Sequence, residues 1–151
     1  MTFVASYVPG IHDGQDDFGY ALAVQQHEYY DSGPDEGGMT YVAIGMPGAK
    51  VNGLRAGKVL IWRPLVSPGT ASVVEAVDPD ASTNTRFGES LAALRPLRDS
   101  GGFVAGAPDA ITDGVQAGQV STLQNAIGNA GWQTLRRNLD QETQGDYRPT
   151  N

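Results

Sequence analysis

The chain has 151 residues, of which 40% are hydrophobic and 18% charged, so it is long enough for one core and too apolar for a disordered segment. Its formal net charge of −7 argues against nucleic acid and anionic membranes as partners, because both repel an acidic protein. The absence of cysteine excludes disulfides, thiolate metal sites and a cysteine nucleophile. The 20 glycines and 9 prolines favour many short strands joined by tight turns.

The predicted elements begin with a lone strand. Residues 3–10 (FVASYVPG) match residues 41–48 (YVAIGMPG) and predict a strand without the strands that should follow it. Two groups of short strands come next, each strand bounded by turn residues. The first group is predicted at residues 20–26, 39–45, 58–63 and 72–77, and the second at residues 89–94, 102–107, 119–123 and 132–137. The polar residues 141–151 predict an extended tail.

A helix is the alternative for the end of the second group. Trp132, Leu135 and Leu139 have helical spacing behind Gly131, and residues 121–127 allow the same interpretation. We predict strands at both places and keep the helix as the alternative.

The two groups are copies of one repeat. Three segments match in the same order: FGYALA at residues 18–23 with FGESLA at residues 87–92, YVAIGMP at residues 41–47 with GFVAGAP at residues 102–108, and AGKV at residues 56–59 with AGQV at residues 117–120. The first copy is longer, which places an insertion between its first two strands, at residues 27–38. An internal repeat of this length, with several short strands in each copy, is typical of a propeller.

The repeated residues have local structural reasons. A phenylalanine can fill the gap between neighbouring sheets, and the glycine after it permits a turn that a side chain would block. Pro47 and Pro108 follow the second strand of each copy and have no N–H with which to continue a ladder. We therefore predict that these residues form a scaffold and take no part in catalysis.

The order Phe-Gly, Gly-Ala-Pro, Ala-Gly-x-Val resembles the FG-GAP repeat, which builds the seven-bladed propeller of integrin α subunits and many bacterial extracellular propellers. The resemblance covers residues 3–137, and Met46 is the one departure in the Gly-Ala-Pro element of the first copy. It implies an all-β fold of two four-stranded antiparallel β-propeller blades plus an extra N-terminal strand. The ring would be closed by oligomerisation or by a partner chain. The predicted boundaries are a partial repeat at residues 1–16, blade one at residues 17–85, blade two at residues 86–140 and the tail at residues 141–151.

Many members of that family bind calcium in the loop between the first and second strands, through alternate acidic residues. Asp31, Asp35 and Glu36 are the candidate calcium ligands of this chain. However, Gly33 replaces the middle ligand and Met39 stands where the last aspartate belongs, and the second copy is too short in this loop. A solvated acidic loop is the alternative, and we predict no resident cofactor.

The sequence contains no G-x-S-x-G elbow, no H-E-x-x-H motif and no phosphate-binding loop, so we predict that the chain is not an enzyme. Tyr29 and Tyr30 begin the inserted loop and are the candidate ligand-binding residues, since loops carry function on rigid scaffolds. Trp62 and Trp132 are expected to pack between sheets.

Two blades cannot close a ring, so their outer faces are expected to be interaction surfaces. The leading hypothesis is a non-enzymatic recognition module for protein or glycan ligands. The alternatives are a structural subunit of a larger extracellular or particle assembly and the non-catalytic part of a hydrolase. The predicted partners are a protein or copies of the chain itself, without nucleic acid or membrane insertion. The resemblance implies an extracellular or surface location, although the N-terminus lacks a signal-peptide pattern.

Overall fold

The computed structural model describes residues 14–27, 39–63, 72–78, 82, 84–97, 100–112, 114–125 and 132–137. All regular structure within these ranges is β-strand, and no helix there could cross a membrane. The predicted all-β fold is confirmed. The predicted N-terminal strand and C-terminal tail lie outside the described residues.

The first copy of the repeat forms one four-stranded antiparallel sheet, which we call sheet one. Its order is the chain order: β1 (Leu22–His27), β2 (Met39–Met46), β5 (Lys58–Arg63) and β6 (Ser72–Val77). Pro47 directly follows β2, as its missing N–H predicts. A hairpin of β3 (Lys50–Val51) and β4 (Leu54–Arg55) then turns through Asn52 and Gly53, whose φ angles of 51° and 85° suit a tight hairpin turn.

The second copy forms sheet two with the same antiparallel order. Its strands are β7 (Ser90–Leu97), β8 (Ser100–Ala107), β11 (Gln119–Asn125) and β12 (Trp132–Arg137), with a small hairpin of β9 (Ile111–Thr112) and β10 (Val115–Gln116) between β8 and β11. The helical alternative is wrong for the described residues, because β11 pairs with both β8 and β12. Neither four-stranded sheet closes on itself.

The two sheets have the same pairing register. Leu22 pairs with Ile44 in sheet one, as Leu91 pairs with Ala105 in sheet two. The remaining strands agree as well: Gly45 pairs with Val59 and Gly106 with Val120, and Trp62 pairs with Val73 and Leu123 with Thr134. The sequence repeat is therefore also a structural repeat, which differs in register only at the end of β7, where the pairing shifts between Leu94 and Leu97.

Alternation along the strands gives each sheet two faces. The front face of sheet one contains Ala23, Ala43, Val59 and Ile61, and its back face contains Leu22, Val24, Ile44 and Leu60. The equivalent residues define the faces of sheet two: Ala92, Val104, Val120 and Thr122 in front, and Leu91, Ala93, Ala105 and Ser121 behind.

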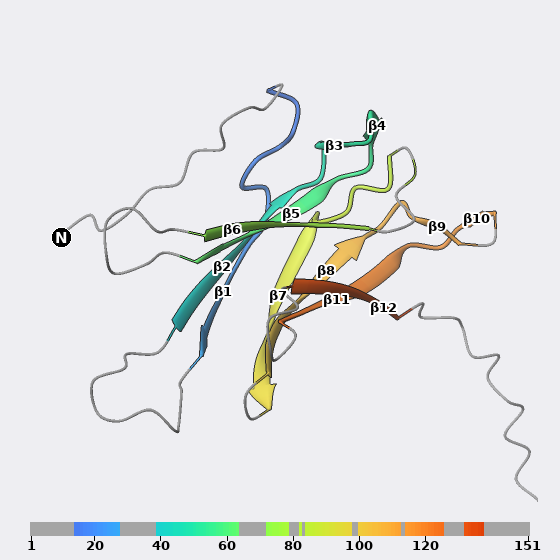
Figure 1. The fold of residues 1–151 in the computed structure, drawn as a ribbon. Coiled ribbons are helices and arrows are strands. Elements are labelled where there is room, and N and C mark those ends of the chain that lie inside the picture. Colours follow the sequence, from blue (N-terminus) through green and yellow to red (C-terminus); the bar gives the residue numbers. More distant parts are fainter. Residues whose placement is uncertain are drawn as a thin grey trace, which may run out of the picture.

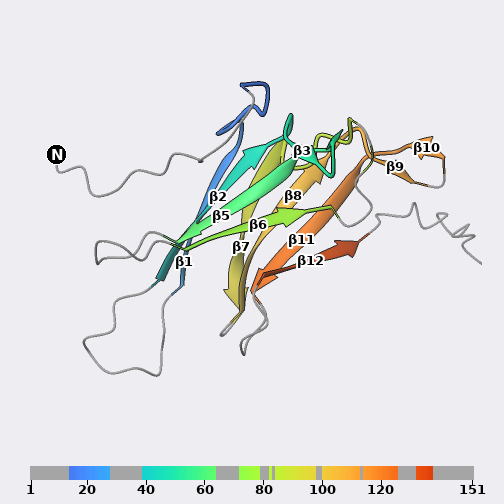
Figure 2. The same cartoon turned by 45° about the horizontal axis from the view of Figure 1, so that its top comes forward.

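The main core forms where the front of sheet one packs on the back of sheet two. Its buried residues are Ala23, Ala43, Val59, Ile61 and Ala76 from sheet one, Phe103, Ala105, Ala107 and Leu123 from sheet two, and Ala110 and Phe87 from turns. Equivalent strands lie beside each other, since β1 contacts β7 and β6 contacts β12 (Figures 1 and 2). The two sheets therefore have the same orientation, and the front face of one packs on the back face of the other.

A second apolar cluster covers the back of sheet one, the face turned away from sheet two. Ile44, Met46, Ala49 and Leu60 are buried there, with Val42, Trp62 and Val73 packed against them. The expectation that Trp62 packs between the sheets is wrong, because it pairs with Val42 and shares its face. The side chain of Trp132 lies outside the described residues.

Candidate functional site

The two sheets are joined by a backbone contact, in which a turn of the second copy packs into a recess, here called a notch, of the first copy. We call this contact the joint. The turn, residues 86–89, is closed by a hydrogen bond from Glu89 N–H to Arg86 O at 3.1 Å, and we call it the second Phe-Gly turn. The first notch consists of Gly45, Ala56, Gly57 and Val59. Phe87 is completely buried, pairs with Gly57 in a parallel bridge and donates its N–H to Ala56 O at 2.9 Å.

The notch requires glycine at two positions. A Cβ on Gly45 would collide with the carbonyl oxygen of Gly88. A Cβ on Gly57 would lie 2.6 Å from the backbone nitrogen of Phe87, and its φ of 82° already disfavours a side chain. Gly88 has a φ of 88°, and a Cβ there would lie only 2.9 Å from the carbonyl oxygen of Lys58. Glycine on both sides therefore lets two backbones meet without side chains between them.

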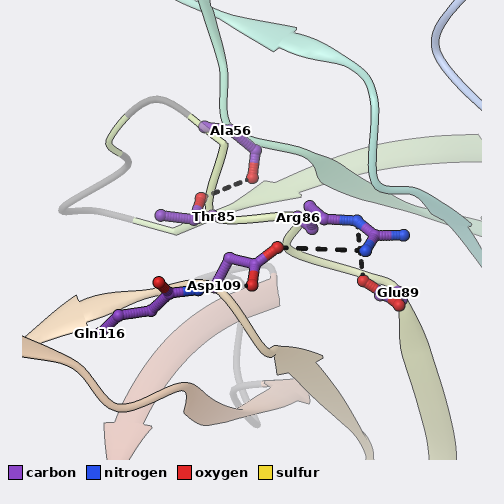
Figure 3. A network of polar contacts seen from close by, with 6 residues as sticks. All are labelled: Ala56, Thr85, Arg86, Glu89, Asp109 and Gln116. Atoms are coloured by element: carbon purple, nitrogen blue, oxygen red, sulfur yellow. Dashed lines mark hydrogen bonds and ion pairs between the residues drawn. The ribbon is translucent and has the colours of Figure 1, made fainter.

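Polar groups beside Phe87 hold the second Phe-Gly turn in place (Figure 3). Thr85 Oγ1 donates a buried hydrogen bond to Ala56 O at 2.7 Å. Arg86 lies with its Nε 2.9 Å from Glu89 Oε2 and its Nη1 3.9 Å from Asp109 Oδ2, and Gln116 donates to Asp109 at 2.7 Å. Thr85 thus ties the turn to the first copy, while the half-exposed Arg86 ties it to its own sheet.

Replacing Thr85 with valine is expected to lower the free energy of unfolding by about 1–1.5 kcal/mol, because the buried Ala56 carbonyl loses one of its two donors while the side-chain volume hardly changes. Urea unfolding followed by circular dichroism measures the loss. Arg86→Met is the control: it removes half-exposed ion pairs and is expected to cost less than about 1 kcal/mol. Equal losses for both variants would contradict the role assigned to Thr85.

The first Phe-Gly turn, residues 17–20, matches the second in its two positive φ angles and in its hydrogen bonds. Asp17 and Gly19 have φ angles of 54° and 82°, against 57° and 88° for Arg86 and Gly88. Tyr20 N–H donates to Asp17 O at 3.1 Å, and Gly19 N–H donates to Gly45 O at 3.1 Å, as Gly88 N–H does to Gly106 O at 3.0 Å. The side chains differ in burial, since Phe18 is 39% exposed whereas Phe87 is 0% exposed.

The second copy has a notch of its own at Gly106, Ala117, Gly118 and Val120, which we call the second notch. A pocket of about 500 Å³ lies there, lined by residues 89–90, 106–108 and 117–120. A Cβ on Gly106 would meet only Ser90 Oγ of its own sheet at close range, and a Cβ on Gly118 would meet Pro108 O at 3.1 Å. The turn that fills the first notch has no counterpart among the residues that line the second.

The candidate residues from the sequence fall outside this joint. Asp31, Asp35 and Glu36, the candidate calcium ligands, and Tyr29 and Tyr30, the candidate ligand-binding pair, lie outside the described residues. Among the residues that are described, no group of His, Asp or Glu side chains is arranged to hold a metal ion.

Sequence reasoning recognised both halves of the joint and assigned a role to one of them. The sequence predicts that Phe87 fills a gap between sheets and that Gly88 permits a turn, and the structure confirms both roles. The Ala-Gly-x-Val segment served only as a marker of the repeat. The repeated glycine of this segment could have indicated the notch. Gly57 and Gly118 each have a positive φ and directly precede a strand, β5 or β11.

A scan against protein-family models finds no matching family, and a search of curated proteins finds no matching relative.

Proposed function

We propose that the chain is a two-blade segment of an FG-GAP-type β-propeller and acts as a non-enzymatic protein-binding module. The observation that carries the proposal is the front-to-back stacking of two equivalent sheets. Among the described residues, such stacking leaves the back of sheet one and the front of sheet two without the sheet that packs on their equivalents. These two surfaces are where the module would bind.

The geometry of the joint supports the propeller. A contact between two different surfaces of a repeated unit generates either a ring or an open series, depending on the rotation per step. Propellers close with about four to eight blades, so two blades need further blades from elsewhere. The shared register and the Phe-Gly joint are the features that a repeated blade requires.

The back of sheet one favours a protein ligand over a glycan. Leu22 and Val24 are 63% and 61% exposed on that face, next to the cluster that contains Trp62. Exposed aliphatic side chains beside an apolar cluster mark a surface that another protein covers. The same observation supports the second candidate function, a structural subunit whose sheet faces are assembly contacts.

A neutral fluorescent dye for apolar surfaces tests the proposal in dilute solution. The wild-type chain is expected to bind the dye, and the double variant Leu22→Ser/Val24→Ser is expected to lose most of this binding with an unchanged circular dichroism spectrum. Ile111→Ser/Val115→Ser is the matched control, since these residues are 57% and 63% exposed on the separate β9–β10 hairpin. Dye binding that the Leu22/Val24 variant leaves intact would contradict an interaction surface on the back of sheet one.

A further inference from the structure

We propose that the second notch binds the first Phe-Gly turn of a second copy of this chain, so that copies join front to back through Phe18 and Gly19. This inference rests on the proposed function and names the protein that the module binds. It starts from one fact: the molecule already contains a filled version of this joint, formed by Phe87 and Gly88 in the first notch.

The first Phe-Gly turn is already in the shape that docking requires. Its φ angles and its closing hydrogen bond are those of the turn that occupies the first notch. Gly19 N–H is held by Gly45 O of its own sheet, just as Gly88 N–H is held by Gly106 O. Docking therefore needs no backbone rearrangement of this turn, which keeps the entropy cost of association low.

The second notch is also preformed. Gly118 has a φ of 71°, close to the 82° of Gly57, and donates to Ala110 O at 3.2 Å as Gly57 donates to Ala49 O at 3.0 Å. The pocket of about 500 Å³ lies where the equivalent Phe87 and Gly88 stand in the first copy. Ala117 is the counterpart of Ala56, whose carbonyl oxygen accepts the N–H of Phe87 in the first notch.

The sheet faces beside the turn and the notch fit the same arrangement. Docking would bring the back of sheet one, with its exposed Leu22 and Val24, onto the front of sheet two of the other copy. The equivalent pair inside one chain, Leu91 and Ala93, lies on the face of sheet two that packs against sheet one. A small residue, Ala92, faces Leu22 and its neighbours across the new contact, in the place that Ala23 takes in the existing one.

The contact between copies is weaker than the joint within a chain. Thr85, which donates to Ala56 O, has Asp16 as its counterpart, and an aspartate lacks the hydroxyl group with which threonine donates. Each copy also carries a formal net charge of −7, so copies repel one another at low ionic strength. Association should therefore strengthen with added salt and with chain concentration. Rings of two, three or four chains would have four, six or eight blades.

Two single substitutions separate the two halves of the contact. Phe18→Ala removes the docking side chain and keeps the second notch. Gly106→Ala places a Cβ where the equivalent Gly45 meets the carbonyl of Gly88, and within its own chain it displaces only the rotatable hydroxyl of Ser90. Val120→Glu puts a charge into the pocket and is an additional variant of the second notch, for use if Gly106→Ala folds poorly. Ile111→Ala is the control at an exposed apolar site outside the contact.

Sedimentation velocity at moderate salt, over a series of chain concentrations, measures the association. The wild-type chain and Ile111→Ala are expected to form the same closed oligomer. Phe18→Ala and Gly106→Ala are each expected to dissociate to monomers, with an apparent Kd raised by at least about thirtyfold, as for an interface hot spot. A mixture of these two variants is expected to form a one-to-one dimer and nothing larger, because only one intact turn and one intact notch remain.

Three results would overturn the inference: a wild-type chain that stays monomeric at its highest soluble concentration, variants that assemble like the wild type, or a mixture that stays monomeric. A peptide with the sequence of residues 15–21 distinguishes another source of the turn. If this peptide binds the wild-type chain but not Gly106→Ala, while the chain itself stays monomeric, the notch accepts a Phe-Gly segment of a different protein. The inference then fails, but the proposed binding module stands. The binding module also stands if the dye experiment gives the expected result while the chain stays monomeric.

Discussion

Replacing Phe87 with alanine is expected to lower the free energy of unfolding by about 3–5 kcal/mol, which is the usual cost of removing a buried phenylalanine ring. Phe87 is completely buried and belongs to the core that joins the two sheets. Since small domains unfold with about 5–15 kcal/mol, the variant is expected to lose a large part of its stability. Urea unfolding followed by circular dichroism measures the change.

Phe18→Ala is the matched control for this substitution. Phe18 occupies the equivalent position in the first copy, with the same backbone conformation, but is 39% exposed. Its loss in the dilute monomer is expected to cost clearly less than the loss of Phe87, because a partly exposed ring removes less apolar area from water than a fully buried one. If Phe87→Ala costs no more than Phe18→Ala, the second Phe-Gly turn does not join the sheets as described.

Gly45→Ala is expected to destabilise the chain by about 3 kcal/mol, at the upper end for a methyl group inserted into a packed interior. The added Cβ would collide with the carbonyl oxygen of Gly88, a backbone atom that cannot rotate away. The collision forces the sheets apart where they meet, so the dependence of the unfolding free energy on urea concentration is a second readout. A slope equal to that of the wild type would mean that the two sheets still unfold as one unit.

Gly106→Ala is the matched control for Gly45→Ala. It places the same methyl group at the equivalent position of sheet two, where it meets the side-chain oxygen of Ser90. Rotation of the Ser90 hydroxyl relieves this contact, so the expected cost in the dilute monomer is below about 1 kcal/mol. Similar costs for the two variants would mean that the first notch is no more crowded than the second.

The strands could be predicted from the sequence because turn residues mark their ends and each copy supports the other. All eight strands of the four-stranded sheets lie where the repeat placed them, with ends that differ by a few residues. The hairpins β3–β4 and β9–β10 were not predicted, since strands of two residues are too short for any alternation of polar and apolar side chains.

The sequence does not predict which face of each sheet packs against the other sheet. The alternation of side chains along a strand shows only that the strand has two faces. Trp62 and Ile61 are neighbours in β5, yet Ile61 lies in the core between the sheets and Trp62 on the back of sheet one. The notch was missed for a related reason. Gly57 and Phe87 are far apart in the sequence, and only the stacking of the sheets brings their backbones together.

The joint between the sheets is tested most directly by residue-resolved hydrogen exchange under native conditions. Phe87 N–H donates to Ala56 of the first copy and Gly88 N–H to Gly106 of the second, so both amides should exchange only when the whole domain opens. We expect their exchange to be as slow as that of Ile61 in β5 and to accelerate equally with urea. Exchange of Phe87 and Gly88 as fast as that of the exposed turn residue Gly114, with Ile61 still protected, would contradict a Phe-Gly turn seated in a glycine notch.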